Sequence, residues 1–181
     1  MDSALFVVVD SAWGAAQMRT LSKRLPPLNG GPIRIETSIG LRDSRGPVHA
    51  GSFLRDRLIQ VDCLRSEFPR VFVHELFHFA WQRLGNPRRM SYERLLVAEC
   101  EARAHGELGW SAEWRRSALL PDDLELRSRR WREYCCESFC DSAAWLYSGV
   151  KEHPEFTLPS RFRARRRVWF RKAIETSRLS I

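Results

Sequence analysis

Short apolar runs and alternating positions dominate the first third of the chain, and they predict strands there. Residues 33–37 (Ile-Arg-Ile-Glu-Thr) alternate apolar and polar side chains, which is the pattern of a half-buried strand. The pattern over residues 11–24 predicts a helix, ended by the two prolines that follow it. Further strands are expected over residues 4–9, 47–53 and 57–62. The first third should therefore form a small, mostly antiparallel sheet.

Beyond residue 63 the pattern predicts helices. Pro69 lies near the start of the first helix, which should stop at Gly85-Asn86-Pro87. Ser91 is a candidate N-cap for a second helix that reaches about Gly106. The remaining expected elements are a short Trp-bearing segment at 110–119, a long helix from Pro121 to Ser148-Gly149, and a basic helix after Pro159. These elements predict an α+β fold in which the sheet comes first.

Length and composition fit one folded domain. The chain has 181 residues, of which 44% are apolar and 29% charged, so it can bury a core of ordinary size. We expect three parts in this domain: a sheet-rich part (1–63), a helical part (64–160) and a basic C-terminal helix (161–181).

The chain shows no sign of a membrane span or an export signal. No stretch is apolar over the length that a bilayer crossing needs. The first residues lack a basic region and reach Asp10 after a short apolar run, so they predict a strand and not a signal peptide. Five cysteines, an odd number, are simplest to understand as reduced thiols. We therefore expect a cytoplasmic protein that does not associate with membranes.

The apolar stretch Val71–Ala80 contains the motif His74-Glu75-Leu76-Phe77-His78. Residues four apart share one face of a helix, so His74 and His78 can bind one metal ion together. Glu75 can then reach a water on that metal as general base. All other positions of this stretch are apolar, and polar side chains in a buried helix need partners. The motif therefore predicts a zinc (Zn2+) site of the kind that a zinc-dependent hydrolase needs.

A catalytic zinc site usually has a third protein ligand, and several residues are candidates. Glu137 and Asp141 are four apart in the long predicted helix, so one carboxylate can bind zinc while the other holds a histidine N–H. The rivals for the third ligand lie closer to the motif, and they are Glu99, Glu101 and His105. Any of these glutamates can instead be a surface residue paired with an arginine.

The motif on a helix after a small sheet resembles the zincin metallopeptidases, and Glu137-x-x-x-Asp141 resembles their gluzincin branch. The short length is similar to that of the minimal gluzincins and the ImmA/IrrE-type peptidases. The resemblance implies that His74, His78 and Glu137 bind Zn2+, that Glu75 is the base, and that Asp141 orients a histidine. In this chain 58 residues separate His78 from Glu137, which implies an inserted helical piece at about 88–120.

Peptide hydrolysis also needs a group that stabilises the oxyanion and a surface that holds the peptide. The candidates for the first role are Tyr134, Tyr147, His105 and His153. In zincins the substrate peptide commonly lies along an edge strand, which here implies the region His49–Phe53.

The cysteines are an alternative set of possible metal ligands. Cys136 and Cys140 are four apart and Cys135 is adjacent, but no second pair completes a structural zinc site. We interpret them as small residues that fill the core.

Positive charge is concentrated at the C-terminal end. The net charge of the chain is +8, and residues 161–181 carry +7 of it. Basic residues interleaved with aromatics, as in Arg161–Lys172, can bind phosphates and stack on bases, or bind an acidic protein. The same pattern also fits an amphipathic helix that docks Phe162, Val168, Trp169 and Ile174 and leaves its arginines in solvent.

Three hypotheses follow from the sequence. The first is a zinc metallopeptidase that acts on an intracellular protein or peptide. The second is a nucleic-acid-associated protein that acts through Arg161–Lys172. The third is a catalytically silent zincin-fold binding module, which the intact Glu75 disfavours because such a module needs no base.

Overall fold

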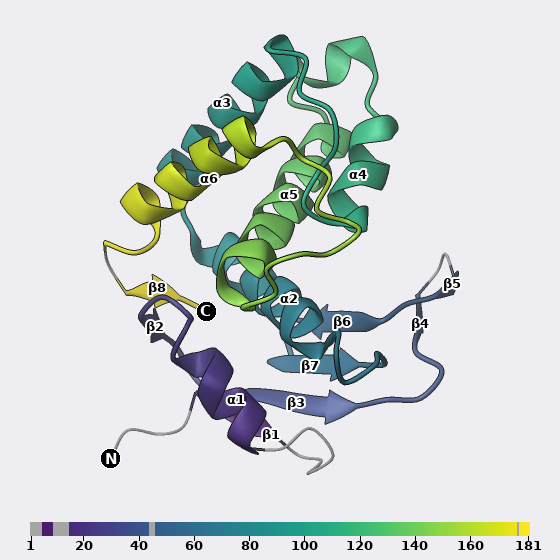
Figure 1. Cartoon of the computed structure of the whole chain (residues 1–181), viewed down its shortest axis with the longest axis vertical. Helices are drawn as coiled ribbons and strands as arrows, with labels where there is room; N and C mark the ends of the chain where they lie inside the picture. The colour runs from purple at the N-terminus through teal and green to yellow at the C-terminus, as the bar shows by residue number, and fades with distance from the viewer. Residues whose placement is uncertain (1–4, 9–14, 44–45, 177) are drawn as a thin grey trace.

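The computed structural model describes residues 5–8, 15–43, 46–176 and 178–181 (Figure 1). The ends of the strand expected at 4–9 and the first part of the helix expected at 11–24 lie outside the described residues. Most of the chain start, for which the sequence predicts no signal peptide, also lies outside them. Within the described parts, the strand appears as β1 (Phe6–Val8) and the helix as α1 (Ala15–Ser22).

The main sheet has four strands in the order β1-β3-β7-β6. The other three strands are β3 (Ile33–Thr37), β6 (Ala50–Phe53) and β7 (Leu58–Val61). β1, β3 and β7 are parallel, and only β6 runs antiparallel to its neighbour β7. The prediction of a mostly antiparallel sheet is therefore wrong. The connection that contains α1 crosses over between β1 and β3, and such a crossover is what parallel neighbours require.

Two pairs of short strands complete the β structure. β4 (Arg42–Asp43) pairs with β5 (Gly46–Pro47), and β2 (Leu28–Asn29) pairs in parallel with β8 (Leu179–Ser180). The last strand corrects the prediction that residues 161–181 form one helix, because the helix α6 covers only Ser160–Ala173. The chain then returns to the first third, where the Leu179 N–H donates to the Pro27 carbonyl at 2.8 Å. At Gly30, with φ +154°, a side chain would collide with the Ile181 carbonyl.

Helix α2 (Phe68–Arg83) carries the motif and ends before Gly85, as predicted. The next helix, α3 (Asn86–Glu101), begins before Ser91 and ends before Gly106, so its predicted N-cap is wrong. Pro87 occupies the first turn, where its missing N–H costs no helical hydrogen bond, and this favours an earlier start. A helix α4 (Trp110–Ser117) follows and matches the expected Trp-bearing segment.

The long helix α5 covers Arg129–Tyr147, so its predicted end is confirmed and its predicted start at Pro121 is wrong. Pro121–Asp123 instead form a separate 3-10 turn, in which the Asp123 carboxylate accepts from the Leu120 N–H at 2.7 Å. Arg127 then adopts φ 44°, which interrupts a helix. The true N-cap is Ser128, whose hydroxyl accepts from the Trp131 N–H at 3.2 Å.

The helix α2 lies between the sheet and α5 (Figure 1). It contacts β6 and β7 on one side and α5 on the other, and most of its apolar side chains are fully buried. The main apolar core joins residues of the sheet, α2, α3, α5 and α6. The fold is thus α+β with a small mixed sheet. None of the helices in the described parts of the chain combines the length and apolar content that a bilayer crossing requires.

A buried ion-pair network crosses the helical half. Arg166 of α6 has no exposed surface, and its guanidinium donates to Glu99 and Glu107 at 2.7 Å each. Glu107 also accepts from the Tyr134 hydroxyl at 2.6 Å and pairs with Arg116 at 3.3 Å. This network joins α3, α4, α5 and α6 at one point inside the protein.

Candidate metal centre

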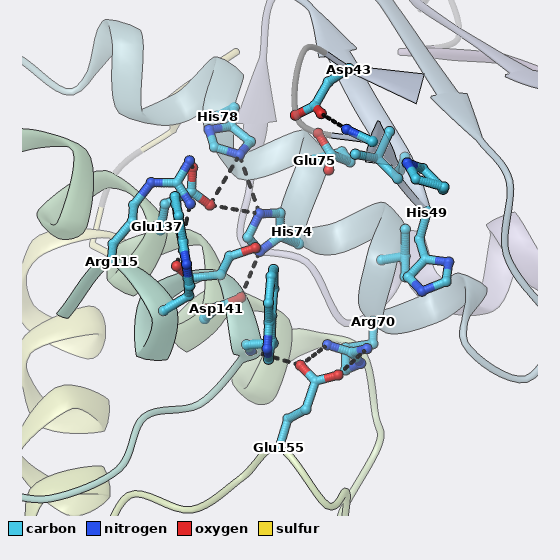
Figure 2. Close-up of a pocket in the computed structure, with 18 residues that line it drawn as sticks. Asp43, His49, Arg70, His74, Glu75, His78, Arg115, Glu137, Asp141 and Glu155 are labelled. Atoms are coloured by element: carbon cyan, nitrogen blue, oxygen red, sulfur yellow. Dashed lines mark hydrogen bonds and ion pairs between the residues drawn. The ribbon is translucent and has the colours of Figure 1, made fainter. Parts of the chain in front are cut away.

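The motif histidines and the predicted carboxylates face each other across the interface of α2 and α5. Figure 2 shows His74, His78, Glu137 and Asp141 converging on one side of a pocket. Both pairs are four residues apart, so each helix presents its pair on one face. The burial of the apolar side chains of α2 fixes its rotation about its axis, and the histidines therefore turn toward α5.

Three ligand atoms lie at the spacing that one metal ion requires. The His74 Nε2 atom is 3.2 Å from the His78 Nε2 atom and 3.2 Å from the Glu137 Oε2 atom. The His78 Nε2 atom is 3.9 Å from the same Glu137 oxygen. Tetrahedral ligands at usual zinc distances lie about 3.3 Å from one another. The two nitrogens and the oxygen thus fit three corners of a zinc site.

Asp141 fixes the orientation of His74. Its Oδ1 atom accepts from the His74 Nδ1 atom at 2.7 Å, and the carboxylate is buried. When His74 is neutral, this bond keeps the proton on Nδ1 and leaves the lone pair on Nε2, the nitrogen that faces Glu137. This is the role that the sequence predicts for Asp141 relative to a ligand.

Electrostatics around the three ligand atoms favours a positive charge between them. Burial works against a charged His78, but Cys136, Glu137 and Glu75 raise its pKa to about 9. Burial alone would raise the pKa of Glu137, but His78, His74 and Arg115 lower it to about 2. Asp141 and Glu137 likewise raise the pKa of His74 well above its usual value in spite of burial. Protons satisfy this demand without a metal, and a bound divalent cation can take their place.

Glu75 lines the same pocket and is held by the sheet. The Ser52 hydroxyl of β6 lies 2.8 Å from the Glu75 main-chain oxygen and also hydrogen-bonds to the Glu75 carboxylate. The edge strand β6 therefore positions the expected base. Nothing in the sequence singles out Ser52, because its contact depends on how β6 lies against α2.

The structure does not bring the rival third ligands to the histidines. Glu99 is buried in the ion pair with Arg166. Glu101 and His105 are exposed at the end of α3 and in the turn after it. Of the proposed third ligands, only Glu137 lies within reach of both imidazoles.

Helix α4 contributes contacts that sequence reasoning missed. The Arg115 Nη2 atom lies 3.1 Å from the Glu137 Oε1 atom, which leaves Oε2 for the histidine side (Figure 2). The Ala112 N–H donates to the second Asp141 oxygen at 3.0 Å. At Gly109 a side chain would collide with the Asp141 carboxylate. The only sequence signal for these contacts is the long separation of His78 and Glu137, which leaves room for further elements but does not say where they pack.

The cysteine cluster lies on the other side of His78. The Cys136 Sγ atom is 3.5 Å from the His78 Nδ1 atom, while Cys135 and Cys140 are buried in the main core. His78, Cys136 and Cys140 also form a group with metal-ligand spacing, through the second nitrogen of His78. Cys136 thus does more than fill the core, because it contacts the imidazole that the sequence predicts as a ligand.

The pocket has a volume of about 740 Å³ and opens between β5–β6, α2, α4 and α5. His49 and Ala50, from the predicted edge-strand region, line it. Among the described residues that form its wall there is none of Tyr134, Tyr147, His105 and His153, the candidates for oxyanion stabilisation. Tyr134 and Tyr147 are buried and bonded to Glu107 and Glu175, and the His153 Nε2 atom pairs with Glu67 at 3.2 Å. The cationic side chains that do line the pocket are Arg70 and Arg115.

Several residues of the basic helix α6 that could have bound a nucleic acid are instead buried or bonded inside the protein. Phe162, Phe170 and Arg166 are buried, and Arg163 donates to main-chain oxygens of Phe156 and Leu158. Val168, expected to dock, is instead exposed. The exposed basic residues of the helix are Arg161, Arg165, Arg167, Arg171 and Lys172. They form a charged surface, but the buried phenylalanines cannot stack on bases.

Comparison of this chain with protein-family models, with curated proteins and with solved structures gives no significant match.

Proposed function

We propose that this chain is a zinc-dependent metallopeptidase of the gluzincin kind, in which His74, His78 and Glu137 hold Zn2+. The observation that carries the proposal is the convergence of two imidazole nitrogens and one carboxylate oxygen at metal-ligand spacing. Asp141 on the far nitrogen of His74 adds the outer support that metal-binding histidines usually have. We further propose that the protein acts on a peptide or protein in the cytoplasm.

The donor set fits a catalytic zinc ion. Two imidazoles and one carboxylate are an established ligand combination for catalytic zinc, and they leave a position for water. The open side of the three ligand atoms is part of a pocket that also contains Glu75. When bound, zinc lowers the pKa of a water ligand and polarises the carbonyl of the substrate.

Glu75 is the base in this proposal. Its carboxylate takes a proton from the attacking water and delivers it to the nitrogen of the leaving amine. Ser52 holds this carboxylate from β6. Arg115 orients Glu137 by pairing with its other oxygen.

The edge strand offers a place for an extended peptide. β6 is the outermost strand of the main sheet, and its first residue lines the pocket. A peptide in extended conformation can add to such an edge through main-chain hydrogen bonds. This arrangement would bring a peptide bond close to Glu75 without a deep, closed cavity.

The first test is the metal content of the purified protein, measured by plasma mass spectrometry. We expect about one zinc per chain in the wild type, and its loss in His74→Ala and in Glu137→Ala, because each change removes one of three ligands. Glu101→Ala and His105→Ala serve as matched controls and should keep the metal, since both side chains are exposed away from the histidines. Wild-type protein without bound zinc after zinc supplementation would overturn the proposal.

The companion measurement is cleavage of unfolded casein by the zinc-loaded wild type, with and without a chelator. Cleavage that stops on chelation and returns with zinc supports the peptidase. A fully zinc-loaded protein that cleaves neither casein nor randomised peptides would instead indicate a silent binding module.

A more sensitive test concerns Asp141. In Asp141→Asn the side chain keeps its size but has one acceptor, while both of its partners, His74 and the Ala112 N–H, donate to it. We expect zinc affinity to fall roughly 10- to 100-fold, as it does when such outer partners are lost. Competition with a chromophoric chelator measures this change. The control is Asp122→Asn, on an exposed turn, and equal affinity in both variants would exclude the orienting role.

A further inference from the structure

Two exposed tryptophans stand at the rim of the candidate metal pocket. Trp110 and Trp114 belong to the pocket wall, and 65% and 40% of their surfaces are exposed. They are four residues apart on α4, and their rings lie nearly parallel, with centroids 6.2 Å apart and an interplanar angle of 15°. Large indole surfaces left in water are costly, and clusters of them at a pocket commonly bind a ligand.

The start of the helix that carries the indoles is held in position relative to the imidazoles. The Trp110 main-chain N–H donates to the Glu155 carboxylate at 2.8 Å. Glu155 in turn accepts two hydrogen bonds from Arg70, at 2.9 and 3.1 Å, and Arg70 lies one helical turn before His74 on α2 (Figure 2). The Ala112 N–H binds Asp141, which holds His74. α4 is therefore tied to both helices that carry the candidate ligands.

The charges around the indoles favour a neutral occupant. Both oxygens of Glu155 are taken by the Arg70 guanidinium, so this carboxylate has little left to attract a cation. The Arg115 guanidinium already lies over the Trp114 ring, 5.5 Å from its centroid, and a second cation there would be repelled. Arg115 itself is paired with Glu137, so its charge is already balanced by a carboxylate and attracts an anionic side chain less. An apolar or aromatic group satisfies the indole surfaces without leaving a charge unpaired.

We propose that Trp110 and Trp114 form a subsite that binds a large apolar or aromatic side chain of the substrate, next to the peptide bond that is cleaved. This inference rests on the proposed function for the nature of the substrate, while the subsite itself is a binding property. It also gives the segment between His78 and Glu137 a role, because its helix α4 supplies the subsite. The specificity of the enzyme is thus carried by the inserted piece.

The test uses peptide hydroxamates, which bind zinc directly and are not cleaved. Four dipeptide hydroxamates that differ only in one side chain, Phe, Leu, Ala or Lys, are titrated into the zinc-loaded full chain by calorimetry. We expect the wild type to bind the Phe and Leu probes roughly five- to tenfold more tightly than the Ala and Lys probes. In Trp110→Ala and Trp114→Ala this preference should fall to less than twofold, with little change for the Ala probe. Trp110→Phe should keep most of it.

The control is Leu126→Ala, which removes another exposed apolar side chain, 75% exposed, that does not line the pocket. It should leave all four affinities unchanged. Zinc content is measured for every variant, so that a loss of metal is not mistaken for a loss of the subsite.

The outcomes separate the two proposals. If the Ala probe binds but the wild type shows no preference, or if the tryptophan variants keep the preference, the subsite is overturned and the metal site stands. If the preference appears as expected but no peptide is ever cleaved, the subsite stands and the peptidase fails. If none of the four probes binds the wild type, both are overturned.

Discussion

Glu75→Gln is expected to lower peptide cleavage by roughly 10²- to 10⁴-fold, the range that a positioned general base usually contributes. Gln keeps the size of the side chain and its capacity to accept from the Ser52 hydroxyl, but it cannot take a proton. Glu75 is not among the ligand atoms that lie together, so zinc should remain bound at wild-type level. Initial cleavage rates and metal content, measured on the same preparation, check both halves of this expectation.

The matched control is Glu125→Gln, which changes an exposed glutamate in the turn before α5. It should cleave at the wild-type rate. A Glu75→Gln variant that retains zinc and also cleaves at the wild-type rate would show that the activity does not use Glu75 as its base.

Arg166→Met is expected to lower the free energy of unfolding by about 3–5 kcal/mol, the usual result of removing one partner from a buried ion pair. Arg166 is fully buried and donates to two buried carboxylates, Glu99 and Glu107, at 2.7 Å each. Burial works against the charged form of Glu107, but Arg166 lowers its pKa below the usual value. Without the arginine both carboxylates lose their main counter-charge. Urea unfolding followed by circular dichroism gives the change.

Two further variants make this prediction sharper. Arg171→Met removes an exposed arginine of the same helix and should not change stability measurably. Arg166→Met combined with Glu107→Gln should be more stable than Arg166→Met alone, because it removes one of the two buried carboxylates that lost the Arg166 guanidinium. If Arg166→Met unfolds at the same urea concentration as the wild type, the network does not stabilise the fold.

The local elements of the fold follow well from the sequence. Residues 33–37 alternate because one face of β3 is buried and the other is not, and the structure places β3 over those residues. The end of α2 before Gly85 and the end of α5 near Gly149 follow from glycines that adopt positive φ angles. Periodicity and turn residues act over a few positions, so a single sequence records them directly.

Contacts between segments far apart in the chain are much harder to predict from a single sequence. The direction of β1 relative to β3 depends on the crossover through α1, and the return of β8 to β2 joins segments about 150 residues apart in the chain. Arg166 looked like one of many solvated arginines, since nothing in its neighbourhood shows that Glu99 and Glu107 meet it inside the protein.

The candidate site depends both on local patterns, which the sequence predicts, and on contacts between distant segments, which it does not. The i, i+4 spacing brought His74 and His78 together in the prediction, and the same spacing paired Glu137 with Asp141. The sequence left several alternatives for the third ligand. In the structure α5 packs against α2, and Glu137 is the candidate that lies close to both His74 and His78. Ser52, Arg115 and Gly109 escaped notice because their roles depend on the packing of β6 and α4.

The separation of the candidate ligands has a consequence for how the metal would be acquired during synthesis. His74 and His78 leave the ribosome together, but 58 residues separate His78 from Glu137, which arrives with α5. In an unfolded chain, joining these ligands closes a long loop at a cost of about 3–4 kcal/mol. A half-made chain can therefore hold the ion only by two nitrogens, and tight capture waits until α4 and α5 have docked. On the proposed ligand set, metal loading is a late step that reports completed folding of the helical half.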